Sequence, residues 1–338
     1  MIWKNIEIFN IAELIELEDG AVTWRRVPEE AEKTLEKGDQ SLRYSRGFTG
    51  VELRFRLKGD QVVIRMAKSA DDGVDNSFQI YRGGFQGPYG DYAKSKTLCT
   101  MDPEDIVISR LQRPERLARM AQLHDTGWDP EVIRIRFDRG QYKLYDVIGD
   151  VETVTREQCP EKTILVYGSS ISVGMDGQNC AISWPSHLAN ILQTDLRNMS
   201  FAGSCMLEPK VCQYLGDLEW DMALLELGIN ASSYPVEKIW ERSRYILEQV
   251  AGRHPDKPVV VISPFYSYHE VQGETDTTAN WREILPQVAA EYPNVRYLNG
   301  LDILGDVRWL TADCLHPSIY GQIRIAQQVY DRIKDIQF

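Results

Sequence analysis

Two patterns of hydrophobic and polar residues divide the chain near Cys159. Before that residue, apolar and polar positions alternate, which is typical of antiparallel strands with one buried and one solvated face. Turn signals at Gly59–Asp60 and Arg139–Gly140 separate two pairs of such segments, as in hairpins. Helical periodicity is scarce there apart from residues 113–123, so the pattern predicts a β-sandwich of the jelly-roll type. The alternating segments are residues 51–57, 62–66, 132–137 and 142–147.

After Cys159, continuous apolar runs alternate with helical stripes at residues 236–250 and 319–333. Such runs predict buried parallel strands, and the helices between them predict an α/β unit with a doubly wound sheet in three layers. We therefore expect an all-β domain at residues 1–155 and an α/β domain at 156–338. Its ligand site should lie beyond the carboxyl ends of the strands. The predicted strands are residues 164–167, 223–228, 259–263 and 295–299.

Composition narrows the choice of partners. The chain has 338 residues, of which 43% are hydrophobic and 26% charged, in the range of globular proteins with about two domains. Its 38 basic and 50 acidic residues give a net charge of −12, which disfavours nucleic acid and anionic lipid as partners. No apolar run reaches the roughly 18 residues of a membrane span, and residues 1–20 do not resemble a secretory signal. We expect a cytoplasmic protein.

The cysteines and histidines do not suggest a metal site. Six cysteines are scattered without a Cys-x-x-Cys pair, and the chain has five histidines. We therefore expect reduced thiols and no metal held by these residues. The cysteines are Cys99, Cys159, Cys180, Cys205, Cys212 and Cys314.

Polar residues and a glycine lie on the predicted ligand-binding side of the sheet. Ser170 follows the first strand at a tight turn into a helix, where its hydroxyl would be exposed and its N–H could face an oxyanion. Gly203 lies in a loop, and Asn230 follows the strand at 223–228. Asp313 precedes His316 by three residues and could hold the imidazole in the tautomer that a general base needs. Taken singly, each residue also fits a helix cap, a turn or an ordinary polar position.

In this order the four blocks resemble the SGNH hydrolases, also called GDSL-type esterases and lipases. The resemblance covers about residues 163–338 and implies a flavodoxin-like fold. It implies that Ser170, in the sequence YGSSIS, is the nucleophile, that His316 is its base and that Asp313 orients the imidazole. It also implies an oxyanion hole made by the backbone N–H groups of Ser170 and Gly203 and by the Asn230 amide.

Two positions depart from the family pattern. Ser169 replaces the Asp of the Gly-Asp-Ser block, and Ala231 replaces the final Asp of the Gly-x-Asn-Asp block. Both changes remove supporting carboxylates and leave the residues of the implied mechanism in place. The Gly-Ser-Ser-Ile variant resembles a branch in which a β-sandwich precedes the hydrolase domain, as in some carbohydrate acetyl esterases and related acyltransferases.

The resemblance implies a serine esterase that removes small acyl groups, acetyl above all, from a carbohydrate or similar polyol without metal or cofactor. One alternative is acyl transfer to an acceptor other than water. Another is a catalytically silent carbohydrate-binding protein. No sequence feature specifies the oligomeric state.

A few further residues have two interpretations. Glu226 is unusual within a buried parallel strand, and it indicates a polar network or an edge position. A substrate pocket could be lined by Phe265, Tyr266, Tyr268, Trp281 and Arg282, although loop aromatics more often serve packing. Cys314, between the candidate Asp and His, is interpreted as a packing residue because no base that would activate a thiol is visible.

Overall fold

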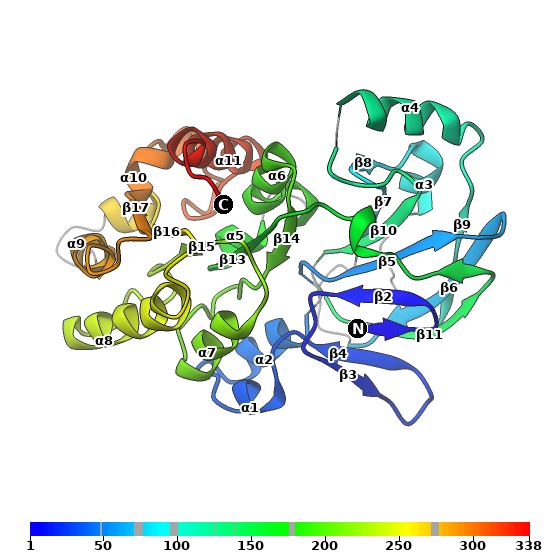
Figure 1. Ribbon diagram of the computed structural model, residues 1–338. Coiled ribbons are helices and arrows are strands. Elements are labelled where there is room, and N and C mark those ends of the chain that lie inside the picture. The colour runs from blue at the N-terminus through cyan, green and yellow to red at the C-terminus, as the bar shows by residue number, and fades with distance from the viewer. Residues whose placement is uncertain are drawn as a thin grey trace. The chain divides into compact units, whose positions relative to one another are not determined.

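The computed structural model describes residues 1–47, 49–70, 77–94, 101–124, 126–138, 140–175, 180–271 and 277–338. These residues form two compact units, coloured along the chain in Figure 1. The β-sandwich unit contains Met1–Arg26, Arg46–Glu161 and Gln193–Asp195. The α/β unit contains Val27–Ser45, Lys162–Leu192 and Leu196–Phe338.

Two antiparallel sheets build the β-sandwich unit. The first has the order β1 (Ile2–Trp3), β2 (Ile6–Phe9), β5 (Glu52–Leu57), β10 (Val132–Phe137), β7 (Phe78–Arg82) and β8 (Phe85–Gln86), with β12 (Val151–Glu152) paired to β5. The second has the order β3 (Glu13–Glu16), β4 (Val22–Arg25), β11 (Tyr142–Ile148), β6 (Gln61–Lys68) and β9 (Glu104–Ser109).

Side chains from both sheets meet in one core. Phe55 of the first sheet and Ile64 and Leu144 of the second are fully buried in the same hydrophobic cluster. The longer strands alternate between the two sheets along the chain, as jelly-roll connectivity requires. The structure therefore confirms the predicted jelly-roll-like sandwich. The helices α3 (Tyr89–Lys94) and α4 (Pro114–His124) lie in its connections.

The turn signals do not close hairpins. β5 and β6, on either side of Gly59, belong to different sheets, and so do β10 and β11 on either side of Gly140. At the first turn the Lys58 N–H donates to the Asp150 carbonyl at 2.9 Å rather than to a residue of β6. Each turn carries the chain from one sheet to the other. The turn residues therefore predicted a turn correctly, but the expected pairing of the two flanking strands is wrong. Arg139 of the second turn lies outside the described residues.

A buried ionic cluster explains why Gln193–Asp195 groups with the sandwich unit. Arg54 binds Asp195 through two hydrogen bonds of 2.7 Å and also donates to Glu52 at 2.9 Å. Burial alone raises the pKa of Glu52, but the guanidinium groups of Arg134 and Arg54 outweigh it and hold that pKa well below its usual range. Buried charges of this kind are tolerated only when they are paired.

A five-stranded sheet organises the α/β unit, in agreement with the predicted fold class. Its order corresponds to 2-1-3-4-5 along the chain, the flavodoxin-like order in which ligands bind where the strand order reverses. The strand order reverses between β13 and β15. The pairs β13–β15, β15–β16 and β16–β17 are parallel. The order is β14 (Asp195–Asn198), β13 (Thr163–Tyr167), β15 (Met222–Glu226), β16 (Val259–Ile262) and β17 (Val295–Leu298).

Alternate strand residues feed two separate cores. Leu165 and Leu225 belong to one hydrophobic cluster, while Val166 and Leu224 belong to another, so both sheet faces are covered. Figure 1 shows α6 and α11 on one face and α7 and α8 on the other. The helices are α5 (Ser170–Val173), α6 (Trp184–Leu192), α7 (Pro209–Asp217), α8 (Val236–Leu247), α9 (Thr277–Ala289), α10 (Gly300–Ile303) and α11 (Ile319–Ile333).

An insert of two short helices between β4 and β5 belongs to the α/β unit. These are α1 (Glu29–Glu32) and α2 (Asp39–Ser45). Val27 and Ala31 are buried in the same core cluster as Leu165 and Leu225. The two units therefore differ from a single division of the chain after residue 155. Residues 27–45 pack with the later part of the sequence, and the long sandwich segment ends at Glu161 instead of at residue 155.

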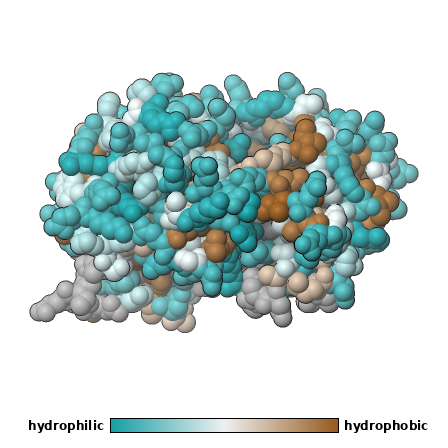
Figure 2. All heavy atoms as spheres, turned by 90° about the horizontal axis from the view of Figure 1, so that it is seen from below, coloured by the Kyte–Doolittle hydropathy of each residue, from teal (hydrophilic) through white to brown (hydrophobic). Residues whose placement is uncertain are grey.

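The face drawn in Figure 2 is mostly hydrophilic, with separate hydrophobic patches. Among the described residues, no helix is long and apolar enough to cross a bilayer. Cys99 lies outside the described residues, and the cysteines that the structure describes as free thiols are Cys159, Cys205, Cys212 and Cys314.

Candidate active site

Ser170 lies at the carboxyl end of β13, on the first residue of α5. Ser169 adopts an extended conformation and caps this helix, its hydroxyl accepting the Ile171 N–H at 3.2 Å. A first-turn residue has no partner for its N–H within its helix. The cap thus places the Ser170 hydroxyl and its backbone N–H at the end of the sheet, where the strand order reverses.

His316 contacts the Ser170 hydroxyl. The distance between His316 Nε2 and Ser170 Oγ is 2.7 Å, and His316 Nδ1 lies 2.5 Å from Asp313 Oδ2. Because the aspartate accepts from Nδ1–H, Nε2 is left as the acceptor for the serine proton. The structure thus joins three of the predicted site residues in one hydrogen-bonded chain.

A closed loop before α11 holds Asp313. The Thr311 N–H donates to the His316 carbonyl at 2.8 Å, and Cys314 takes a left-handed conformation at φ 58°. Asp313 Oδ1 accepts from the Thr311 hydroxyl and from the backbone N–H groups of Leu315 and His316. Burial alone raises the pKa of Asp313, but these hydrogen bonds and that from the His316 ring outweigh it and keep the pKa well below its usual range. The carboxylate stays ionised beside the imidazole.

The three predicted oxyanion donors have no acceptor within the described residues. They are the backbone N–H groups of Ser170 and Gly203 and the side-chain amide of Asn230. Asn230 Oδ1 accepts the Cys205 N–H at 3.1 Å, which leaves its Nδ2 donors for another acceptor. Gly203 has φ 67°, a conformation that favours glycine. Free donors of this type can stabilise an oxyanion.

Glu226 underlies the serine loop. Its Oε2 accepts from the Ser169 N–H at 2.7 Å, from the Ser169 hydroxyl at 2.7 Å and from the Ser172 hydroxyl at 3.0 Å. The side chain is fully buried, and Oε1 has no hydrogen-bond partner among the described residues. Burial raises the pKa of Glu226 to about 7, although the hydrogen bonds from the two serines lower it. Of the two explanations that the sequence left open for Glu226, the structure therefore shows the polar network.

Two of the loop aromatics serve packing. Phe265 and Trp281 are buried, and Trp281 Nε1 donates to the Ala231 carbonyl at 3.0 Å. A Cβ on Gly228 would lie 2.7 Å from the Trp281 ring, so the indole packs directly on the loop before Asn230. The Cys314 thiol is exposed rather than packed, which corrects the interpretation of that residue. Its carbonyl accepts the Tyr268 N–H at 2.8 Å.

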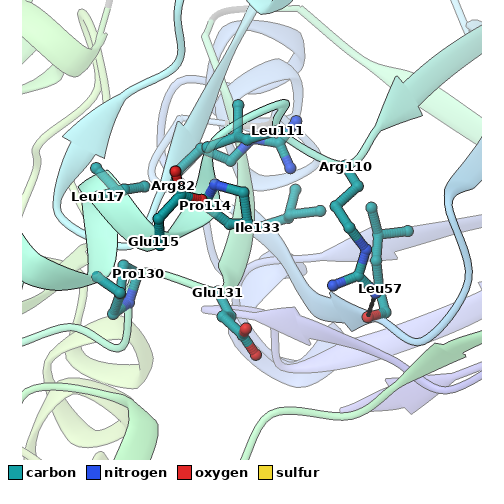
Figure 3. Close-up of a pocket in the computed structure, with 11 residues that line it drawn as sticks. Leu57, Arg82, Arg110, Leu111, Pro114, Glu115, Leu117, Pro130, Glu131 and Ile133 are labelled. Atoms are coloured by element: carbon teal, nitrogen blue, oxygen red, sulfur yellow. Dashed lines mark hydrogen bonds between the residues drawn. The ribbon is translucent and has the colours of Figure 1, made fainter.

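A pocket of about 180 Å³ lies in the β-sandwich unit between α4 and the first sheet (Figure 3). Its basic residues are already paired, because Arg82 binds Asp91 at 2.8 Å and Arg110 donates to backbone carbonyls that include that of Leu57. Its described lining residues include no serine, cysteine or histidine. It therefore offers no nucleophile for acyl chemistry.

Residues 161–334 match the model of the GDSL-like lipase/acylhydrolase family. The chain is a member of this family. The match confirms the resemblance seen in the sequence, and it makes ester hydrolysis the general activity of this acylhydrolase. Comparison with curated protein sequences finds no match.

Solved structures share the fold of this acylhydrolase over nearly its whole length. The salicylyl-acyltransferase SsfX3 from a tetracycline biosynthetic pathway has a TM-score of 0.77 at 19% identity, with 98% of this chain and 94% of that chain covered. A family two carbohydrate esterase from Cellvibrio japonicus has a TM-score of 0.62 at 13% identity, with 98% and 96% covered. An acetyl xylan esterase from Butyrivibrio proteoclasticus has a TM-score of 0.58 at 11% identity, with 99% and 96% covered. At these identities the likeness shows the fold, a β-rich part before an α/β part.

Proposed function

We propose that this acylhydrolase is a serine esterase that removes small acyl groups, acetyl in particular, from a carbohydrate or a similar polyol. The observation that carries the proposal is the 2.7 Å contact between His316 Nε2 and Ser170 Oγ, continued to Asp313 at 2.5 Å. A hydroxyl is a weak nucleophile until a neighbouring base accepts its proton. This arrangement supplies both the base and the group that orients it.

In the proposed reaction, Ser170 Oγ attacks the ester carbonyl carbon while His316 Nε2 takes the hydroxyl proton. The negatively charged Asp313 stabilises the imidazolium that forms. The C–O bond to the alcohol then breaks, and the imidazolium donates its proton to the departing alcohol. Water attacks the acyl-serine by the same route, which releases the acid and restores Ser170.

The tetrahedral intermediates of both steps carry a negative charge on the former carbonyl oxygen. In the proposal, the N–H groups of Ser170 and Gly203 and the amide of Asn230 donate to that oxygen. These donors are free in the described structure, so they need not break an internal hydrogen bond first. Loss of one such donor usually lowers kcat by a factor of about 100 to 1,000.

The proposed substrate class is supported by similar two-part proteins whose names describe carbohydrate esterases and an acetyl xylan esterase. A carbohydrate esterase from Clostridium thermocellum with the same kind of fold was solved in complex with cellohexaose. The SsfX3 structure favours a second candidate, acyl transfer to an acceptor other than water, because its TM-score of 0.77 exceeds the 0.62 and 0.58 of the two esterases. Product analysis with and without acceptor alcohols separates hydrolysis from transfer.

Labelling with a fluorophosphonate tests the proposed nucleophile. Wild type and Ser170→Ala are compared by intact mass and by turnover of p-nitrophenyl acetate. We expect one adduct and measurable turnover with wild type, and neither with the variant, because the probe and the ester both need the activated hydroxyl.

An equal adduct on Ser170→Ala would assign the reactive group to another residue. Wild type without adduct or turnover would reject the esterase proposal and favour the silent binding protein. A circular dichroism spectrum that matches wild type controls for the fold of the variant.

A further inference from the structure

Gln40, in the insert helix α2, contacts the loop that contains Gly203, one of the proposed oxyanion donors. A Cβ built on Gly203 would lie 1.9 Å from Gln40 Nε2, so this amide rests directly against the α-carbon of the glycine. Gln40 is exposed, and its side chain has no hydrogen-bond partner among the described residues. An unused amide donor therefore lies beside a proposed oxyanion residue.

One turn later, the same helix contacts the segment that follows α5, the short helix that begins with Ser170. Tyr44 is four residues beyond Gln40, and residues at this spacing share one helix face. Its hydroxyl donates to the Met175 sulfur at 3.8 Å, and the Met175 N–H donates to the Ser170 carbonyl at 3.0 Å. One face of α2 thus contacts both the loop of Gly203 and the segment that follows α5.

An ion cluster fixes the position of α2. The Glu36 carboxylate accepts from Arg242 at 2.6 Å, from the Tyr234 hydroxyl at 2.8 Å and from Lys238 at 3.1 Å. These three residues follow β15 and belong to α8 or the loop before it. Because Val27 and Ala31 are also buried in the core of the same unit, the insert is held at both its core face and its connecting turn. Groups on a fixed element are placed more precisely than groups on a free loop.

We infer that α2 forms one wall of the ester-binding site and that Gln40 Nε2 donates a hydrogen bond to the polyol part of the bound ester. The inference rests on the proposed function. The backbone N–H groups and Asn230 suffice for the carbonyl oxygen, so a further donor is free for the remaining substrate oxygens. A neutral amide suits neutral acceptors such as hydroxyl and ring oxygens, and the phenol of Tyr44 extends the same face.

Two acetate esters that differ in their alcohol test this role. Gln40→Ala and Gln40→Glu are compared with wild type on p-nitrophenyl acetate and on acetylated sugars. Gln40→Glu keeps the length of the side chain and removes the N–H donor. With either variant we expect kcat/KM for the sugar ester to fall about fivefold, the usual effect of one neutral hydrogen bond, while the aryl ester stays within twofold. Lys37→Ala, an exposed change in the same turn, should alter neither.

Equal losses on both esters, or no loss on either, would overturn the inference. So would wild-type turnover of the aryl ester with no turnover of any acetylated sugar, because the polyol would then be the wrong substrate. Absence of wild-type turnover on both esters would reject the proposed function itself. Unchanged aryl-ester turnover also shows that each variant is folded.

Discussion

At Ser169, a backbone N–H and a hydroxyl both donate to Glu226, a carboxylate that arrives from the neighbouring strand. The family pattern has an aspartate at position 169, and here the acidic group lies on β15 instead. Gly168 permits this approach, because a Cβ there would lie 2.7 Å from Glu226 Oε2. Ser172 binds the same oxygen, so the residues on both sides of Ser170 are tied to one side chain.

Glu226→Gln should change the pH dependence of stability. The pKa of Glu226 in the folded protein is about 7, above its usual 4.5, so the native state keeps a proton that the unfolded chain releases. Native stability should therefore fall as the pH rises from about 4.5 to 7, by about 3 kcal/mol for this group. The variant should lack that slope in urea unfolding measured across this window.

Glu219→Gln, at an exposed position, controls for the loss of an acidic residue. Because Glu226 is buried and touches the serine loop rather than substrate, kcat of Glu226→Gln should fall about tenfold with KM nearly constant. An unchanged slope together with unchanged kcat would contradict the role of Glu226 as a positioning residue.

At the scale of elements, the attachment of the insert to α8 depends on the Glu36 cluster. Burial raises the pKa of Glu36, but hydrogen bonds from Tyr234 and Lys238 and the charge of Arg242 outweigh it and lower that pKa. A lowered pKa means that the cluster stabilises the fold above the usual glutamate range and that this contribution is lost as the pH falls below it. A double-mutant cycle of Glu36→Ala and Arg242→Ala should give a coupling energy of about 1 kcal/mol in urea unfolding.

The Glu29–Lys33 pair of α1 is the matched control. Its side chains are 50% and 68% exposed, whereas that of Arg242 is 11% exposed. Exposed pairs of this kind contribute little, so the same cycle there should give a coupling near zero. Equal coupling energies at the two sites would show that the Glu36 cluster does not fix the insert.

The hydrophobic pattern of the sequence marked some strands and helices but not others. Buried parallel strands such as β13 and β16 are continuous apolar runs and were found from that pattern. β14, with the sequence DLRN, is short and mixes charged with apolar residues, so no periodicity marked it. The insert helices have four and seven residues, too few for a helical stripe to stand out.

The candidate site follows the same division. Ser170 and the pair Asp313 and His316 could be proposed because they lie in short motifs whose order along the chain resembles a family, whereas each residue alone also fitted an ordinary role. The link from Ser169 to Glu226 depends on the register of β13 against β15, which pairs Tyr167 with Leu225. Register is a tertiary property, so the sequence indicated only that Glu226 was unusual. The contact of Gln40 with Gly203 had no local signal at all.

For the whole molecule, the grouping of residues 27–45 with the α/β unit has a direct test. A fragment of residues 156–338 lacks Val27 and Ala31 and would expose the core that they cover. We expect it to unfold at a midpoint at least about 10 °C below that of the full chain, or without a cooperative transition, because several apolar side chains lose their burial. Differential scanning calorimetry measures both properties.

A fusion of residues 27–45 to the same fragment through a flexible linker should recover cooperative unfolding. Because the fusion has the insert but not the sandwich unit, it separates the effect of losing the insert on unfolding from the effect of losing the sandwich unit. A bare fragment that unfolds with the midpoint of the full chain would refute the assignment of the insert to the α/β unit.

The early position of the insert in the sequence also sets an order of events during synthesis on the ribosome. Val27 and Ala31 leave the exit tunnel long before Met206 and Leu207, which belong to the same core. At roughly 5–20 residues per second the delay is roughly 10–40 s. During that time the insert, which lies between β4 and β5, has no completed core to pack against, and the α/β core stays unfinished until the insert packs into it. A gene rearrangement that moved residues 156–338 alone would leave this piece behind, and one that moved residues 1–155 alone would separate it from the core that it completes.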